Sequence, residues 1–445
     1  MHRFIIITIC LFIAQFSYGQ EYNDLIVNHI SIKGNKKTKR QIVERELNYT
    51  IGDTISDLPA ALSKSQKNLI NTRLFHNADL DFVKEGKYVN IIIRLQERWY
   101  FWPIPIFEYA DPNFATWVRR QRIDYINYGI ILEKRNMFGL NQKLRFKIRR
   151  GIREQYTVNY NVPMLFNNNN LGLFTDLSYF RQKEIHERID DLEYIDIKAD
   201  RYIYHELRAL GGINFRPAFY SKHKIYAGYR QYNYDDSIEY LFDKPIENFN
   251  EYFTIGYTFN YFKGDYVMYP LQGTKMRFNH EVGLGKKQYA YTDFYISFHN
   301  PIAQKLTFSY GLNSYVSYTK QFPYFVFAGQ GKTWYIRGFE DYMYQNDLIL
   351  VNRLQLKYTL LDKKQFEFDW IPSEKFSKPF LSIFLNGFVE LGYSTNFIQE
   401  YTEQTPLSIG AGIDFLTYYD WVGRIEFVYN SREETWINLH WGYIF

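Results

Sequence analysis

The chain has 445 residues, a formal net charge of +5 and an aromatic content of 20%, with 42 tyrosines and 38 phenylalanines. This charge is too small to favour nucleic-acid binding. The mean hydropathy of −0.39 is too low for a bundle of membrane-spanning helices. Strands that face lipid on one side and water on the other produce such a composition. A large soluble β-protein produces it too, so the periodicity of the sequence has to decide.

Residues 1–19 are expected to form a secretory signal peptide. His2 and Arg3 precede an apolar run over 4–14, and Ser17-Tyr18-Gly19 supplies small residues before a cleavage site. The only cysteine of the sequence, Cys10, lies within this segment. The mature protein is therefore expected to have neither disulfides nor thiolate metal sites.

Residues 26–97 predict a compact α+β domain with the element order β-α-α-β-β. Thr38 is expected to cap the first helix, and Asp57 with Pro59 marks the start of the second. A hairpin follows the second helix, because two alternating segments flank the turn Glu85-Gly86-Lys87. The three predicted strands span 26–32, 78–83 and 88–95.

This region resembles a POTRA domain, the periplasmic module of outer-membrane assembly proteins. The resemblance rests on Ile32-Lys33-Gly34-Asn35, Thr38, Ile42, Arg45-Glu46-Leu47, Gly52-Asp53 and Arg73-Leu74-Phe75. Most of these residues are expected to build the fold. The resemblance implies that exposed strand edges bind extended client segments by β-augmentation.

Residues 100–445 consist of repeated hairpin patterns with alternating polarity. In Phe384–Gly392, Leu385, Val389 and Leu391 occupy one face, and polar or small residues occupy most of the other. A soluble sandwich explains one such strand equally well, but the pattern continues to the C-terminus. We therefore predict a transmembrane antiparallel β-barrel of about sixteen strands, since a sheet in lipid must pair its edges.

The connections between the predicted strands alternate between short and long. Short turns are expected at 136–139, 163–170, 270–273, 300–301 and 419–420, and longer loops near 183–192, 235–250, 320–347 and 394–404. This alternation is typical of the periplasmic and extracellular sides of a barrel. The aromatic run 99–102, where the two domains meet, suits either an interfacial belt or packing between domains.

One strand predicts a strongly basic inward face. Lys143, Arg145, Lys147 and Arg149 alternate with apolar residues. Pairing with acidic residues on other strands explains them better than an anion path does.

The most informative motif is Ile336-Arg337-Gly338-Phe339. A charged residue beside glycine, enclosed by aromatics, suggests a loop that folds into an enclosed space and meets an opposite charge there. Glu390 lies on the polar face of its strand and is the candidate partner, through two parallel hydrogen bonds. The alternative is that Arg337 is a solvated loop residue. The pair would hold the loop in place and would not be catalytic.

The barrel region resembles the outer-membrane assembly superfamily that includes BamA, TamA and the two-partner secretion transporters. Residues 336–339 match that family's Val/Ile-Arg-Gly-Phe/Tyr motif, which lies in a loop inside the lumen. The resemblance implies that its arginine meets a Phe-x-Asp-x-Gly motif. Here that motif is Phe388, Glu390 and Gly392, with Glu in place of Asp. Trp441, Tyr443 and Phe445 resemble the C-terminal signal by which barrels are recognised.

The resemblance implies a protein of the outer membrane that assists the insertion or translocation of other proteins, with the POTRA domain in the periplasm. Its partners would be client outer-membrane or secreted proteins, outer-membrane lipid and other assembly subunits, without nucleic acid. The alternative is a passive channel or a structural subunit of an outer-membrane complex. No enzyme motif, cofactor fingerprint or metal-ligand spacing is found in the sequence, so no catalytic residue is predicted.

Overall fold

The computed structural model describes residues 24–109, 125–165, 170–190, 193–235, 249–319, 336–339, 347–373, 376–395 and 404–441. The predicted signal peptide lies outside these residues, as do Tyr443 and Phe445. None of the described helices is long and apolar enough to cross a membrane.

The N-terminal module, residues 24–99, is an α+β unit with a mixed four-stranded sheet of order β2-β1-β4-β3. Strands β1 and β4 are parallel, whereas the other two pairs are antiparallel. The two-residue strand β2 was not predicted from the sequence. The elements are β1 (Leu25–Lys33), α2 (Arg40–Glu44), β2 (Thr54–Ile55), α3 (Leu58–Asn71), β3 (Phe75–Glu85) and β4 (Tyr88–Glu97).

The two helix starts of the module differ from each other. Asp57 caps α3 as predicted, because its carboxylate accepts from the backbone N–H of Ala60 at 2.9 Å. The prediction for Thr38 is wrong, since the N-cap of α2 is Lys39 and has no side-chain cap. Thr38 instead donates its hydroxyl to Glu97 at 2.6 Å. A short-range cap pattern could not reveal this carboxylate from the end of β4.

The barrel region forms one 16-stranded antiparallel sheet, which confirms the predicted fold and strand number. The sheet follows chain order from β5 to β22, with β10 and β11 left out. Its strands are β5 (Phe101–Tyr109), β6 (Ile126–Met137), β7 (Gln142–Gly151), β8 (Arg153–Val162), β9 (Leu171–Gln182), β12 (Tyr204–Phe215), β13 (Ser221–Tyr234), β14 (Phe249–Gly264), β15 (Gly273–Gly285), β16 (Tyr289–Ala303), β17 (Leu306–Ser317), β18 (Leu348–Gln365), β19 (Phe380–Thr395), β20 (Leu407–Thr417), β21 (Trp421–Asn430) and β22 (Thr435–Trp441).

Side-chain burial follows the predicted alternation in several strands, most clearly in β17, β19 and β21. In β19, Leu385 and Leu391 are exposed on the outer face, whereas Asn386 and Glu390 are buried on the inner face. Successive side chains of a strand point to opposite faces, so the apolar set covers the outside and the polar set lines the lumen.

The longer connection predicted near 183–192 contains secondary structure that was not predicted. Within it, β10 (Glu184–Asp190) and β11 (Glu193–Lys198) form a separate two-stranded sheet. The strands are short and rich in charge, so their alternation was weak in the sequence.

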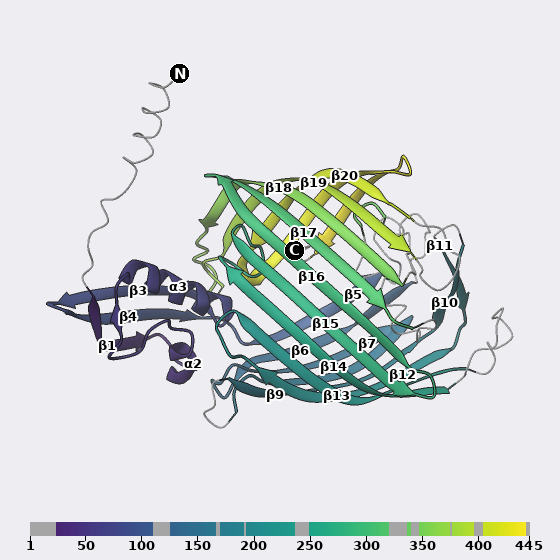
Figure 1. Ribbon diagram of the computed structural model, residues 1–445, viewed down its shortest axis with the longest axis horizontal. Coiled ribbons are helices and arrows are strands. Elements are labelled where there is room, and N and C mark those ends of the chain that lie inside the picture. The colour runs from purple at the N-terminus through teal and green to yellow at the C-terminus, as the bar shows by residue number, and fades with distance from the viewer. Residues whose placement is uncertain are drawn as a thin grey trace, which may run out of the picture.

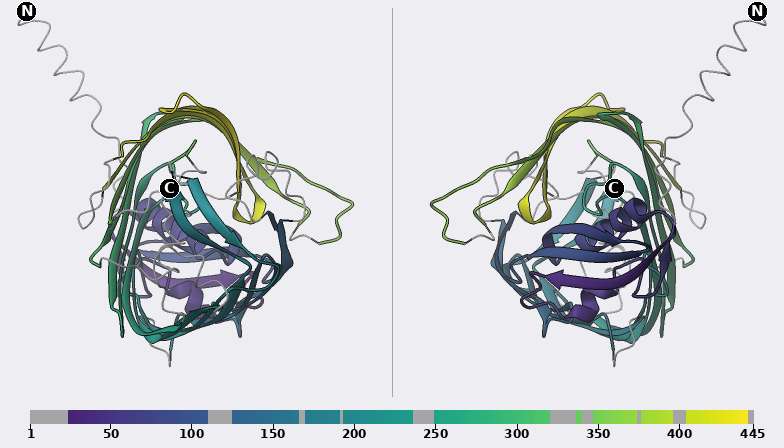
Figure 2. Two further views of the ribbon diagram at one scale, coloured as in Figure 1. Left: turned by 90° about the vertical axis from the view of Figure 1, so that its right-hand side faces the viewer. Right: turned by 90° about the vertical axis from the view of Figure 1, so that its left-hand side faces the viewer.

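The module lies against one end of the barrel, as Figures 1 and 2 show from three sides. We call this end the module rim and the opposite end, which carries β10 and β11, the far rim. The rim turns that hydrogen-bond to the module contain Gly139, Pro163, Arg216, Val267 and Asp420. The connection 366–379 also lies at this rim and is longer than the short turns predicted there.

Candidate functional site

The motif 336–339 lies fully inside the barrel. All four residues are buried, and the exposed fraction of Arg337 is 0%. Its Nε lies 2.7 Å from Oε1 of Glu390, and its backbone N–H donates to Oε2 of the same carboxylate at 2.8 Å. The structure therefore brings together the arginine and the glutamate that the sequence singled out, despite the longer side chain of Glu.

A second carboxylate, absent from the sequence-based expectation, completes the contact. Nη1 of Arg337 donates to Oε1 of Glu426 on β21 at 2.7 Å. Arg353 on β18 donates its Nε to Oε1 of Glu390 at 3.1 Å. The guanidinium of Arg337 therefore binds two carboxylates, one through Nε and the other through Nη1. The sequence had suggested two parallel hydrogen bonds to Glu390 alone. We call Arg337, Arg353, Glu390 and Glu426 the lumen cluster.

The lumen cluster contains two cationic and two anionic side chains, so its formal charges balance. This balance matters because all four side chains are almost completely buried. Burying an ion is costly unless an opposite charge and hydrogen bonds replace the lost water. The alternation of β21 places Glu426 inward, but other polar residues on that strand also point inward, so the sequence could not select it.

The predicted strand motif contributes an aromatic face as well as a charge. The ring of Phe388 lies 3.3 Å from the guanidinium carbon of Arg337, measured to the ring centroid. A guanidinium stacked on an aromatic ring is stabilised by the negative electrostatic face of that ring. Phe388 and Glu390 therefore hold the same side chain from adjacent positions on the inner face of β19.

The two glycines of the motifs make room for this contact. Gly338 has φ of +80°, and a Cβ there would lie 2.8 Å from Cγ1 of Val428. Its carbonyl accepts from Nδ2 of Asn430 at 2.6 Å. A Cβ on Gly392 would lie 2.2 Å from Cδ1 of Ile336. Glycine is the residue that fits both a positive φ and so close an approach.

The apolar residues of the loop motif extend the anchor. Ile336 and Phe339 belong to one buried cluster with tyrosines from the inner faces of several strands. Rings on neighbouring strands touch, with 6.0 Å between the centroids of Tyr204 on β12 and Tyr232 on β13. The buried tyrosines of this cluster are Tyr204, Tyr232, Tyr252, Tyr289 and Tyr315. The loop motif is therefore held by ion pairs at Arg337, a backbone hydrogen bond at Gly338 and apolar packing at Ile336 and Phe339.

Three of the four basic residues on the inner face of β7 form ion pairs with carboxylates on β6 and β5. Lys143 lies 3.0 Å and Arg145 3.9 Å from Glu133 of β6. Arg149 lies 3.2 Å from Glu108 of β5. These contacts match the interpretation preferred from the sequence, in which the basic residues pair with acidic ones.

The predicted C-terminal signal is described only in part. Trp441 ends β22, whereas Tyr443 and Phe445 lie outside the described residues. The role of these three residues stays a prediction.

Comparison with known proteins identifies the fold. Neither the protein-family models nor the curated proteins contain a match. Among solved structures, BamA from Haemophilus ducreyi lacking POTRA domains 1–3 matches over 94% of this chain and 84% of that one, with a TM-score of 0.52 and 14% identity. CdiB from Acinetobacter baumannii matches over 94% and 73%, with a TM-score of 0.52 and 13% identity. The chain has the BamA-type barrel fold.

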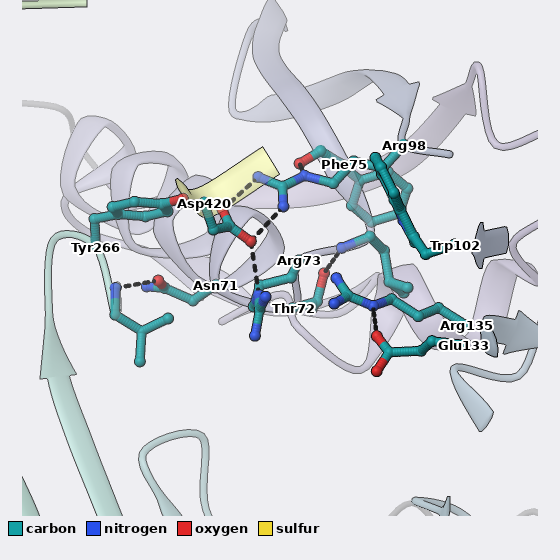
Figure 3. A network of polar contacts seen from close by, with 12 residues as sticks. Asn71, Thr72, Arg73, Phe75, Arg98, Trp102, Glu133, Arg135, Tyr266 and Asp420 are labelled. Carbon is teal, nitrogen blue, oxygen red and sulfur yellow. Dashed lines mark hydrogen bonds and ion pairs between the residues drawn. The ribbon is translucent and has the colours of Figure 1, made fainter. Parts of the chain in front are cut away.

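In this BamA-type barrel a second buried ionic group joins the module to the rim. Figure 3 shows Asp420, in the turn between β20 and β21, facing Arg98 and Arg73 of the module. Both carboxylate oxygens of Asp420 accept hydrogen bonds from Arg98, at 2.6 and 2.8 Å. Arg73 Nε donates to Oδ2 of Asp420 at 2.7 Å. Tyr266, from the turn between β14 and β15, donates its hydroxyl to the same carboxylate. We call these four residues the junction cluster.

The electrostatics of the junction cluster favour the ionised carboxylate. Burial acts to raise the pKa of Asp420, but the hydrogen bonds and charge of Arg98, with the charge of Arg73, outweigh it and hold this pKa well below its usual range. The sequence did not reveal this site, because its members lie in segments far apart in the chain.

Further contacts fix the module of this BamA-type barrel to the same rim. Arg216 binds both oxygens of Glu46, and Nη2 lies 2.7 Å from Oε2. Asn71 accepts from the backbone N–H of Val267 at 3.0 Å. Within the aromatic run 99–102, Tyr100 is buried in the core of the module. Packing between domains therefore accounts for that part of the run.

Proposed function

We propose that this BamA-type barrel lies in the outer membrane and assists the insertion or translocation of other proteins there. The observation that carries the proposal is the order of the sheet. Strands β5 and β22 stand at its two ends, and no ladder joins them within the described residues. A client strand that pairs with such an edge satisfies backbone groups that lipid leaves unpaired.

The outer face of the barrel supports a membrane location. Large apolar side chains are exposed on strand after strand, and the exposed fraction reaches 55% for Ile409, 56% for Phe427 and 65% for Ile437. A soluble protein rarely exposes so extensive an apolar surface. The inner face carries the charged lumen cluster and the ion pairs of β7, which matches the polar interior of outer-membrane barrels.

The module, in this proposal, acts as a POTRA domain in the periplasm. Strand β3 forms one edge of its sheet. The C-terminal half of β3 is exposed, including Phe82 and Val83. An extended client segment can add to this edge and bury those side chains. The docking of the module against the rim then keeps a captured segment close to the barrel.

Depletion of the protein from its native cells tests the proposal. We expect specific outer-membrane or surface proteins to fall in abundance, and wild-type protein supplied in trans to restore them. An outer-membrane proteome that is unchanged after depletion would contradict the proposal.

Planar-bilayer recording separates this function from that of a passive channel. The motif loop is anchored inside the lumen by Arg337, so we expect a small and unsteady conductance. Replacement of Arg337 by alanine should increase the conductance, because the loop loses its ionic anchor. A large, steady and ohmic conductance of the wild-type protein would favour a porin.

A further inference from the structure

The two end strands of the barrel sheet present different hydrogen-bonding edges. On the β5 side, the backbone N–H of Arg135 donates to the carbonyl of Tyr100 at 2.7 Å. The register continues from this pair through Phe101–Lys134 and Trp102–Glu133. In an antiparallel ladder, hydrogen-bonded and non-hydrogen-bonded pairs alternate. The even-numbered residues of β5 therefore direct their N–H and C=O groups towards β6.

The odd-numbered residues of β5 direct the same groups away from β6, to the open edge. Two successive members of this set, Pro103 and Pro105, have no N–H group. The open edge of β5 thus has a carbonyl at every odd position but donors only at Phe101, Phe107 and Tyr109. A strand laid along this edge loses two hydrogen bonds in the middle of its ladder.

By the same reasoning, the open edge of β22 has a backbone donor and a backbone acceptor at every position that faces outward from the sheet. The backbone N–H of Asn430 donates to the carbonyl of Glu434 at 3.0 Å, and the register then pairs Tyr429 with Thr435 and Val428 with Trp436. Even-numbered residues of β22 therefore face β21. Thr435, Ile437, Leu439 and Trp441 direct both N–H and C=O to the open edge, and none of them is proline.

The side chains of β22 also define what can be added to it. Ile437 and Leu439 are exposed on the apolar outer face, and Asn438 is buried on the lumen side. An added strand continues both faces only if it alternates apolar and polar residues. This is the pattern of a strand from another outer-membrane barrel.

We propose that a client strand of this alternating type pairs with β22 and not with β5, and that Pro103 and Pro105 prevent β5 from serving as the receiving edge. The proposal rests on the strand-capture function proposed above and specifies which edge performs it. The prolines also weaken any direct pairing of β5 with β22, because two carbonyls of the opposite strand find no donor.

A photo-crosslinking experiment on the purified full chain in lipid nanodiscs tests the proposal. The probe is a synthetic peptide with the sequence of residues 431–441, which carries a photoreactive leucine at the position of Leu439. Attachment sites are mapped by mass spectrometry. We expect attachment to 435–441 to exceed attachment to 101–109 by about tenfold, since two missing hydrogen bonds weaken pairing by a factor of about 5 to 150.

The double variant Pro103→Val/Pro105→Val restores both donors and should raise attachment to β5 by about the same factor. Pro301→Val, at the end of β16 and away from the two edges, is the matched control and should change nothing. Heat-modifiable migration on gels shows that each variant is folded.

Several results would overturn the proposal: wild-type attachment that favours β5 or is equal on both edges, attachment to neither edge, or a distribution that the double variant leaves unchanged. These results concern the receiving edge alone. The proposed function stands or falls separately, on the depletion experiment in cells.

Discussion

The lumen cluster and the junction cluster both consist of arginines bound to carboxylates, but they differ in the ratio of cations to anions. In the lumen, two arginines and two glutamates neutralise one another, and the side chains of Arg337, Glu390 and Glu426 have exposed fractions of 0%. At the junction one carboxylate, Asp420, serves two arginines, and the side chain of Arg73 is 35% exposed. The difference indicates that the first cluster fixes a loop within the barrel, whereas the second joins two domains that are easier to separate.

The largest expected effect is that of Arg337→Ala, which removes the centre of the lumen cluster. Glu390 then keeps its contact with Arg353, but Glu426 loses its arginine partner. An uncompensated buried charge costs about 3–5 kcal/mol. The urea midpoint of the heat-modifiable form measures this loss.

Arg201→Ala is the matched control, because Arg201 pairs with Asp235 while its own side chain is 61% exposed. That substitution should cost less than about 1 kcal/mol. Equal midpoints for the two variants would show that the lumen cluster does not hold the barrel. The charge swap Arg337→Glu/Glu390→Arg should not restore stability, since the new carboxylate at 337 would face Glu426.

Asp420→Asn should have the next largest effect, on the docking of the module. Arg98 and Arg73 lose their counterion, and the cost is about 3 kcal/mol, at the low end for buried pairs because Arg73 contacts water. We expect the distance between spin labels on the module and the barrel to become broadly distributed.

Glu44→Gln removes a carboxylate from the exposed pair with Arg40 and is the control. It should leave the distance distribution narrow, because exposed pairs of this spacing contribute about 0.3–0.5 kcal/mol. A narrow distribution in Asp420→Asn would contradict the role given to the junction cluster.

Gly338→Ala should destabilise the loop anchor by about 1–3 kcal/mol, a smaller amount than the loss of Arg337. The positive φ is unfavourable for alanine, and the new methyl meets Val428. Gly387→Ala on β19 is the control, since a Cβ there has no neighbour within 4 Å. Thermal unfolding should separate the two variants, and identical unfolding curves would show that the loop adapts freely.

Lowering the pH should have the smallest effect, and it should loosen the docking of the module at the junction cluster only in strong acid. The folded-state pKa of Asp420 lies below its unfolded value, so its contribution is complete above the ordinary carboxyl pKa of about 4 and is lost as pH falls below it. The spin-label distance should therefore stay constant from neutral pH to about pH 5 and broaden only in stronger acid. Broadening near pH 6 would show that another group controls docking.

The fold was largely predictable because it depends on local patterns. Alternation over Phe384–Gly392 and its counterparts predicted the strands, and Asp57 with Pro59 predicted the start of α3. The contact of Arg337 with Glu390 could be anticipated because a motif resemblance supplied one residue and strand parity supplied the other. Glu426 and the junction cluster could not, because they depend on which inward residues or turns meet across the barrel, and a single sequence does not contain that distance information.

The central claim, that this barrel assists the assembly of other outer-membrane proteins, is tested most directly by pulse-labelling during depletion. Newly made outer-membrane proteins are followed until they reach their folded, heat-modifiable form. The account predicts that a specific set of them remains unfolded once this protein is depleted, and that wild-type protein restores their folding. Unchanged folding kinetics for every labelled outer-membrane protein would contradict the account.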